Sequence, residues 1–269
     1  MGYEPNNVED DSVLTPADDL KNATTVEPSA EAVKVQRGDT GKAVVVLSGG
    51  MDSTVCATLA VREYGAENIG ALHVSYGQRT AAREKQAFAA VAERLGIQTR
   101  LAVETPFFRA IGGSALTDAN IAVPDAGELI GHEIPVTYVP FRNAHLLAMA
   151  VSWAEVLGAS KIYIGAVAQD SSGYPDCRPE FYEAYNLAVR RGTKAGDIEV
   201  VTPLIALRKH EIVSLGLELG APFDLTWSCY SREDCACGVC DSCVLRLRAF
   251  EGAGAVDPVP YAPRLAGHD

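Results

Sequence analysis

The chain has 269 residues, a formal net charge of −12 and 48% hydrophobic residues, which is typical of a globular protein with one good-sized α/β domain or two small ones. The acidic balance argues against broad, non-specific contact with a nucleic-acid backbone. The sequence has no apolar run long enough to span a bilayer and no signal-peptide pattern, so we expect a cytoplasmic protein.

Residues 1–41 are rich in Asp, Glu, Asn, Thr and Pro and show no periodic apolar pattern. A segment of this composition cannot bury enough apolar surface to offset the entropy lost on folding. We therefore predict a disordered acidic extension over residues 1–41. We predict that an α/β domain over residues 42–225, a small cysteine module over residues 226–252 and an extended surface tail over residues 253–269 follow it.

Short apolar runs alternate with helical patterns from Ala43 onward. Residues 43–47 are all apolar, which is typical of a strand buried on both faces. Further strands are predicted at residues 69–75, 98–103, 161–164 and 199–202, and helices at residues 52–64, 81–95, 143–157, 179–191 and 208–219. Because strands and helices alternate, we predict a parallel sheet with right-handed crossovers and helices on both faces.

A Ser-Gly-Gly turn joins the first predicted strand to the first predicted helix. Free backbone N–H groups at a helix N-terminus attract anions, and Gly49 and Gly50 lack Cβ atoms that would keep phosphate oxygens away. Ser48 and Ser53 add hydroxyl donors, whereas the Asp52 carboxylate needs another role, such as binding Mg²⁺ or orienting the loop. An ordinary capped turn is the alternative, but the strand and helix around the turn favour a phosphate site.

Five of the seven cysteines fall within residues 229–243, a crowding that suits a metal site better than a disulfide framework. Cys237, Cys240 and Cys243 form C-x-x-C-x-x-C, and Cys229 precedes them. Four thiolates suffice for a closed tetrahedral zinc site, which leaves no position for substrate and is therefore structural. A [4Fe–4S] cluster also uses four cysteines. Spacing alone neither includes nor excludes Cys235.

The pattern S-G-G-M-D-S at residues 48–53 resembles the loop of the PP-loop ATP pyrophosphatases. This resemblance implies a Rossmann-like (HUP/PP-loop) nucleotide-binding domain that cleaves ATP between the α and β phosphates. The substrate is activated as an adenylate, and a nitrogen or sulfur nucleophile then displaces AMP. Carried over by position, the ATP-binding residues are Leu47, Ser48, Gly49, Gly50, Met51, Asp52, Ser53, Thr54, Val55, Cys56 and Ala57.

Four further blocks make the resemblance more specific. They are Y-G-Q-R at residues 76–79, Y-V-P-F-R-N at residues 138–143, G-Y-P-D-C-R-P-E-F at residues 173–181 and T-W-S-C-Y at residues 226–230. With the loop and the cysteines, the chain resembles the 7-cyano-7-deazaguanine synthases of queuosine precursor biosynthesis. Phe141 departs from the family, which usually has a small residue before the arginine, and this difference affects the expected shape of the pocket.

The resemblance implies a reaction and its partners. 7-Carboxy-7-deazaguanine, ATP, Mg²⁺ and ammonia would give the nitrile through an acyl-adenylate and an amide. A homodimer without direct contact to nucleic acid is expected. Zn²⁺ would be bound by Cys229, Cys237, Cys240 and Cys243, which leaves Cys235 as an extra cysteine.

The expected site residues lie at strand ends and helix starts, where open α/β sheets bind ligands. The expected catalytic residues are Asp52, Ser48, Ser53 and Arg142, and Lys209 is a further candidate for ATP binding. The expected substrate-binding residues are Tyr76, Gln78, Arg79, Arg142, Asn143, Gln169, Asp170, Asp176 and Arg178.

Simpler structural roles compete with some of these assignments. Arg79 and Lys209 fit solvated positions as well as phosphate contacts, Asn143 can be a helix cap, and turn chemistry explains Asp176. Separately, we expect five residues to be packed in the interior: Cys56, His73, Trp153, Cys177 and Phe181.

Two other functions are compatible with parts of the pattern. A related ligase would join the adenylated carboxylate to an amine on a protein or another molecule and stop at the amide, because nothing in the loop distinguishes ammonia from a larger amine. A non-catalytic nucleotide- and zinc-binding subunit of a modification complex is the second alternative. The complete loop with Asp52 argues against the non-catalytic alternative.

Overall fold

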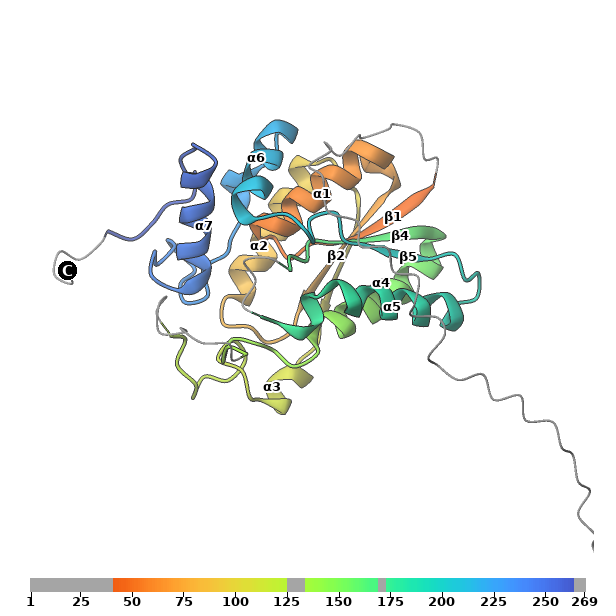
Figure 1. The fold of residues 1–269 in the computed structure, drawn as a ribbon, viewed down its shortest axis with the longest axis horizontal. Coiled ribbons are helices and arrows are strands. Elements are labelled where there is room, and N and C mark those ends of the chain that lie inside the picture. Colours follow the sequence, from red (N-terminus) through yellow and green to blue (C-terminus); the bar gives the residue numbers. More distant parts are fainter. Residues whose placement is uncertain (1–40, 125–133, 169–172, 264–269) are drawn as a thin grey trace, which may run out of the picture. The chain divides into compact units, whose positions relative to one another are not determined.

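Five parallel strands form a single sheet at the centre of the fold, in the order β3-β2-β1-β4-β5. The computed structural model describes residues 41–124, 134–168 and 173–263. The strands, shown in Figure 1, are β1 (Lys42–Val46), β2 (Ile69–Ser75), β3 (Thr99–Glu104), β4 (Ala159–Ile164) and β5 (Glu199–Val201). The predicted parallel sheet is therefore confirmed, and β1 lies between β2 and β4 because nearly all of its side chains are apolar and buried.

Helices follow the strands as crossover connections. The predicted helices are present as α1 (Met51–Tyr64), α2 (Ala81–Arg94), α4 (Arg142–Leu157), α5 (Pro179–Gly192) and α6 (Lys209–Leu219). Two helices that the sequence did not predict are α3 (Phe107–Ile111) and α7 (Asp241–Gly252). No helix among the described residues is long and apolar enough to span a membrane.

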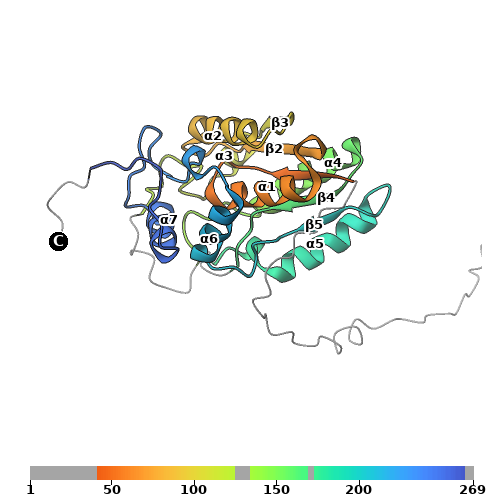
Figure 2. The same cartoon turned by 90° about the horizontal axis from the view of Figure 1, so that it is seen from above.

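Alternate residues of β1 enter two different apolar cores. Ala43 and Val45 pack with side chains of α1, α2 and α6, whereas Val44 and Val46 pack with side chains of α4 and α5. Figures 1 and 2 show α1 and α6 on one side of the sheet and α4 and α5 on the other. The predicted Rossmann-like arrangement with helices on both faces is confirmed.

Most of the expected interior residues are buried, but two are not fully so. Cys56 and His73 are enclosed, and His73 stacks on a phenylalanine ring. Cys177 is also buried. Trp153 and Phe181 are only partly buried and pack against the second core, the one that contains Val44 and Val46.

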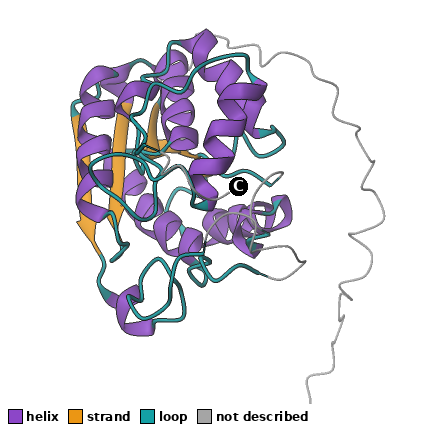
Figure 3. Ribbon diagram, turned by 90° about the vertical axis from the view of Figure 1, so that its left-hand side faces the viewer, coloured by secondary structure: helices purple, strands orange, loops and turns teal. Residues whose placement is uncertain are grey.

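The C-terminal segment packs onto the sheet domain through α7, which lies beside α6 in Figures 1 and 2. Beyond α7 the chain returns along the cysteine loop: Ala236 N–H donates to the Pro260 carbonyl at 2.8 Å, and Ala262 N–H donates to the Ala236 carbonyl at 2.8 Å. Figure 3 colours the whole fold by secondary structure, with helices in purple, strands in orange and loops in teal. Because Val259 and Asp257 are buried, the tail does not lie wholly on the surface.

The division of the chain into an extension, a nucleotide-binding domain, a cysteine module and a tail remains a prediction. The extension over residues 1–41 falls almost entirely outside the described residues. The described residues all belong to one compact unit.

Candidate active site

A cavity of about 300 Å³ opens at the carboxyl ends of β1, β2 and β4, the edge where open α/β sheets bind their ligands. Its walls come from the glycine-rich turn, the segment after β2, the start of α4 and the C-terminal segment. The expected site residues that line it are Leu47, Ser48, Gly50, Met51, Asp52, Ser53, Tyr76, Gln78, Arg79, Arg142, Asn143 and Lys209.

The glycine-rich turn places two hydroxyl groups and the N-terminus of α1 at this cavity. The Oγ atoms of Ser48 and Ser53 are 2.9 Å apart, and Gly50 N–H donates to Ser48 Oγ at 3.2 Å. No side chain caps the start of α1, so the N–H groups of its first turn remain available to a ligand. This geometry suits an anion at the positive end of the helix dipole.

Gly49 allows the turn to pack closely against its neighbours. Its φ is +88°, and a Cβ atom there would lie 2.7 Å from Phe88 N and 2.8 Å from the Glu84 carbonyl oxygen. On the other side, Trp227 N–H donates to the Gly49 carbonyl at 2.8 Å. The turn is therefore fixed between α2 and the beginning of the C-terminal segment, and a larger residue would displace it.

Asp52 and Lys209 meet at the end of the cavity that the glycine-rich turn lines. Lys209 Nζ lies 2.5 Å from Asp52 Oδ2, and their side chains are 18% and 24% exposed. Asp52 Oδ1 is buried and has no hydrogen-bond partner among the described residues. A buried carboxylate oxygen without a protein donor is a suitable ligand for a hard cation.

The rest of the proposed ATP loop faces away from the cavity. Thr54, Val55, Cys56 and Ala57 are buried, and the last three belong to the core between α1 and the sheet. Burial raises the pKa of the Cys56 thiol to well above its ordinary value, so this thiol stays protonated. Direct contact of these four side chains with ATP remains a prediction that their packing does not support.

Arg142 projects into the cavity from the first residue of α4. One of its Nη atoms donates to Tyr76 Oη at 3.0 Å, and its guanidinium lies 5.4 Å from the centre of the Tyr76 ring. Among the described residues, none of the ion pairs includes Arg142. Its charge is therefore available to an anionic group of a ligand.

Two features fix the start of α4. Phe141 has φ +57°, a left-handed conformation that is strained for a bulky residue. Asp176 Oδ2 accepts the Asn143 N–H at 2.9 Å, and Asn143 Nδ2 donates to the Asp176 carbonyl at 3.0 Å. Both features determine where Arg142 points.

Several expected substrate-binding residues do not line the cavity. Asp176 is 3% exposed and supports α4 instead, and Arg178 is exposed at the start of α5. Gln169 and Asp170 lie outside the described residues. Their roles in substrate binding remain predictions.

Arg79 organises a loop beside the cavity. Its guanidinium donates to the carbonyl oxygens of Ala115 at 2.8 Å, Asp118 at 3.1 Å and Ile121 at 2.5 Å. These bonds use most of its donors. The contact with phosphate that the sequence suggested remains a prediction.

Glu84 is a cavity residue that the sequence did not indicate. It lies in the first turn of α2, where Gln78 Nε2 donates to its Oε2 at 3.0 Å and Thr80 Oγ1 donates to its Oε1 at 2.9 Å. The Gln78 Oε1 atom accepts the Tyr76 N–H at 2.8 Å, which fixes the orientation of the Gln78 amide. The only sequence signal was an acidic residue shortly after the Y-G-Q-R block.

Four cysteine sulfurs converge in the C-terminal segment. The Sγ atoms of Cys229, Cys237, Cys240 and Cys243 lie within 4.8 Å of one another, and those of Cys237 and Cys243 are 3.8 Å apart. One tetrahedral ion with bonds of about 2.3 Å to sulfur keeps its ligands about 3.8 Å apart, whereas a [4Fe–4S] cluster binds its cysteines at separate iron atoms. The spacing suits a single ion. Cys235 lies outside the group.

Backbone donors surround these sulfurs. The N–H of Cys237 donates to Cys229 Sγ at 3.4 Å, and the N–H of Cys240 donates to Cys237 Sγ at 3.3 Å. Backbone donors of this kind stabilise thiolates, the form in which cysteines bind metals.

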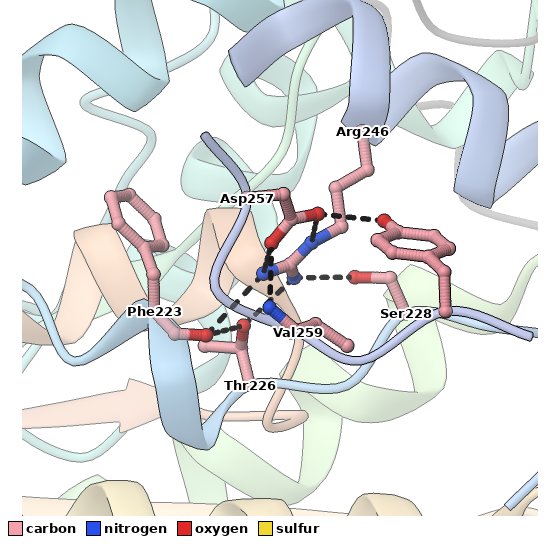
Figure 4. Close-up of polar contacts among 7 residues, drawn as sticks. Phe223, Thr226, Ser228, Arg246, Asp257 and Val259 are labelled. Atoms are coloured by element: carbon pink, nitrogen blue, oxygen red, sulfur yellow. Dashed lines mark hydrogen bonds and ion pairs between the residues drawn. The ribbon is translucent and has the colours of Figure 1, made fainter. Parts of the chain in front are cut away.

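A buried ion pair joins α7 to the chain beyond it (Figure 4). Arg246 Nε donates to Asp257 Oδ2 at 2.7 Å and its Nη2 donates to Asp257 Oδ1 at 2.9 Å, while the two side chains are 3% and 2% exposed. Arg246 Nη1 also donates to Thr226 Oγ1 at 2.7 Å and to Ser228 Oγ at 3.3 Å. Tyr261 Oη donates to Asp257 Oδ2 at 2.6 Å. Ser228 and Arg246 also line the cavity. The network therefore stabilises one of the cavity walls.

Comparison with known proteins finds a matching family model and closely similar curated relatives. The family model described as "Queuosine biosynthesis protein QueC" matches residues 42–254. A curated 7-cyano-7-deazaguanine synthase of Acidobacterium capsulatum is 67% identical over 226 residues, which cover 83% of this chain and 97% of that protein. One of Chlorobium chlorochromatii is 57% identical over 224 residues, with 83% and 97% coverage.

Solved structures are more distant. NMN synthetase from Francisella tularensis gives a TM-score of 0.38 at 21% identity, over 69% of this chain and 64% of that one. The U34-tRNA thiolase NcsA from Methanococcus maripaludis gives 0.41 at 16% identity, over 80% and 65%.

Proposed function

The chain belongs to the QueC family of queuosine biosynthesis proteins, and on this basis we propose that it converts 7-carboxy-7-deazaguanine and ammonia to 7-cyano-7-deazaguanine with ATP. One observation carries the proposal: in a chain 67% identical to a curated synthase of that name, a single cavity joins the S-G-G-M-D-S turn to Arg142. An anion site suited to ATP and a cation suited to a substrate carboxylate would then face the same space.

The end of the cavity that the glycine-rich turn lines, called the phosphate end below, would bind ATP. The first-turn N–H groups of α1, the Ser48 and Ser53 hydroxyls and Lys209 provide donors and positive charge for the phosphates. Mg²⁺ fits the unpartnered Oδ1 atom of Asp52. When bound, it would neutralise charge on the phosphates.

The reaction would proceed in two activation steps. The substrate carboxylate attacks the α-phosphorus, the bond to pyrophosphate breaks, and an acyl-adenylate forms. Ammonia attacks the acyl carbon, loses a proton, and AMP leaves to give the amide. The amide oxygen then attacks the α-phosphorus of a second ATP and the bond to pyrophosphate breaks, after which loss of AMP with two protons from nitrogen gives the nitrile. The enzyme's main contribution would be to position these groups and exclude water.

Arg142 would bind the substrate carboxylate. We expect Arg142→Met to raise KM for 7-carboxy-7-deazaguanine roughly 10- to 100-fold, because a hydrogen-bonded charge would be left without its partner. KM for ATP should change little, since the phosphate end is built from other residues. Steady-state kinetics with each substrate varied in turn would measure both. Arg190→Met, on the exposed side of α5, is the matched control, and an unchanged KM for the deazaguanine would contradict the role of Arg142.

Zn²⁺ is the ion proposed for the four cysteines, with a structural role. Removing it with a chelator should expose residues 229–250, so trypsin should cleave after Arg232 and Arg248 at least about tenfold faster. Cleavage would be followed by mass spectrometry and zinc content by atomic absorption. A Cys235→Ser variant should keep full zinc content, because Cys235 is not in the group. Equal cleavage rates with and without zinc would contradict the structural role.

The product distinguishes this reaction from the amide-forming ligase. The protein would be incubated with ATP, Mg²⁺, ammonium and 7-carboxy-7-deazaguanine, and products identified by mass spectrometry. Nitrile supports the proposal, whereas amide alone, or product only with an added protein amine, supports the ligase. No pyrophosphate with any substrate would indicate a non-catalytic subunit. We also propose that the protein is a homodimer, as the family resemblance implies. We further propose that it acts in the cytoplasm and, in keeping with its acidic charge, without direct contact to nucleic acid.

A further inference from the structure

Glu84 is a carboxylate in the cavity that the proposed reaction leaves without a role. It lines the cavity together with apolar residues such as Val74, Leu116 and Leu146. Among the described residues, no ion pair includes Glu84. Burial raises the pKa of its carboxyl group, and the bonds from Gln78 and Thr80 oppose that shift. Further donors from a ligand would stabilise the ionised form of such a partly desolvated carboxylate.

The carboxylate is held in one orientation and keeps capacity for a ligand. Gln78 and Thr80, which donate to it, are only 4% and 3% exposed. Each Glu84 oxygen accepts one of these bonds, whereas an ionised carboxylate offers about four lone-pair positions. One acceptor position therefore remains on each oxygen, which leaves capacity for two further N–H bonds.

Glu84 and Arg142 belong to one connected wall of the cavity. Arg142 donates to Tyr76 Oη, Tyr76 N–H donates to Gln78 Oε1, and Gln78 Nε2 donates to Glu84 Oε2. The wall therefore presents a cation and an anion joined by a hydrogen-bonded chain. A planar ligand with an acidic group at one end and a pair of donors at the other is complementary to it.

Of the two heterocycles in the proposed reaction, the deazaguanine has this form. Its pyrimidinone ring carries adjacent N1–H and 2-amino donors, and its carboxylate is on the other ring. Adenine presents one donor and one acceptor on the corresponding edge, so a carboxylate can accept only one bond from it. The ATP phosphates would be repelled by Glu84.

We propose that Glu84 accepts hydrogen bonds from the N1–H and 2-amino groups of the substrate and thereby selects the 2-aminopyrimidinone ring. This assignment rests on the proposed function and specifies how the same cavity recognises its substrate. Arg142 would then bind the carboxylate of the same molecule. The apolar residues on the cavity wall suit the faces of the flat ring.

A cycle that combines one variant with one substrate analogue tests this role. Wild-type and Glu84→Gln proteins, both loaded with zinc, would be assayed with 7-carboxy-7-deazaguanine and with its 2-deamino analogue. We expect Glu84→Gln to raise KM for the substrate roughly 10- to 100-fold, with KM for ATP and ammonium unchanged. Wild type should prefer the substrate over the analogue by a similar factor, and Glu84→Gln should lose most of that preference.

The controls separate binding from folding. Glu93→Gln makes the same change on the exposed face of α2 and should match wild type. Circular dichroism and zinc content would verify the fold of each variant. If Glu84→Gln does not fold, the wild-type protein alone tests the proposal, through its preference for the substrate over the analogue. Equal affinity of the wild-type protein for the two molecules overturns the proposal.

Two other outcomes distinguish a wrong role for Glu84 from a wrong proposed function. Suppose that the wild-type protein converts the substrate and that Glu84→Gln changes only KM for ammonium or ATP. This result would overturn the role of Glu84 and leave the proposed function standing. Wild type that does not convert 7-carboxy-7-deazaguanine would overturn the proposed function itself.

Discussion

Replacing Asp52 by asparagine is expected to lower kcat for nitrile formation on the order of 100- to 1,000-fold while the fold is retained. The Asp52 Oδ2 atom meets Lys209 and its buried Oδ1 atom has no partner among the described residues. Asparagine keeps the shape but removes the charge that would hold Mg²⁺ and balance the lysine. Pyrophosphate release at saturating substrate measures the effect.

Two comparisons make the Asp52 result interpretable. Asp197→Asn changes an exposed aspartate before β5 and should leave kcat unchanged. Asp52→Asn should also need a higher Mg²⁺ concentration for half-maximal rate, whereas a purely structural effect would lower stability without shifting that concentration. Full activity of Asp52→Asn at ordinary Mg²⁺ would remove Asp52 from the catalytic machinery.

Asp257→Asn is expected to destabilise the protein by about 3–5 kcal/mol, because it leaves the buried Arg246 guanidinium without its counter-charge. The two side chains are 3% and 2% exposed and join through two parallel hydrogen bonds. Urea unfolding of the zinc-loaded protein, followed by circular dichroism, measures the change.

The chain contains a matched control for this experiment. Arg232 and Asp234 form a similar two-bond pair, but their side chains are 45% and 67% exposed. Asp234→Asn should therefore leave the unfolding midpoint unchanged, since water solvates the remaining guanidinium. Replacing both buried partners, as in Arg246→Met with Asp257→Leu, should destabilise less than Asp257→Asn alone. Equal effects of the two aspartate changes would show that burial of the pair contributes nothing.

The arrangement of the sheet followed from patterns that are local in the sequence. The apolar run before Ser48 predicted a strand buried on both faces, and β1 is the central strand of the sheet. Helix α7 was missed because its start is occupied by the cysteine cluster, with Cys240 at the N-cap and Cys243 in the first turn. The spacing of the cysteines in this segment obscures the apolar periodicity that would have indicated a helix.

The candidate site was only partly accessible from the sequence. The turn at residues 48–53 and Arg142 could be identified because they belong to distinctive blocks, and both line the cavity. Glu84 could not be identified from the sequence, because a glutamate in the first turn of a helix is usually a solvated residue. In the fold, the turn at Gly49 packs closely against α2 at Glu84, a contact between segments that are distant in the sequence. The pairing of Arg246 with Asp257 likewise depends on how the chain turns after α7.

The hydrogen bond from Trp227 to Gly49 has a consequence for synthesis on the ribosome. The glycine-rich turn emerges early, but the donor that fixes its carbonyl lies near the end of the sheet domain and opens the cysteine segment. A nascent chain that has not yet released Trp227 therefore carries the whole turn without this restraint. Such a nascent chain would carry the S-G-G-M-D-S pattern but lack this hydrogen bond, so the turn is held in full only once the start of the C-terminal segment has been made.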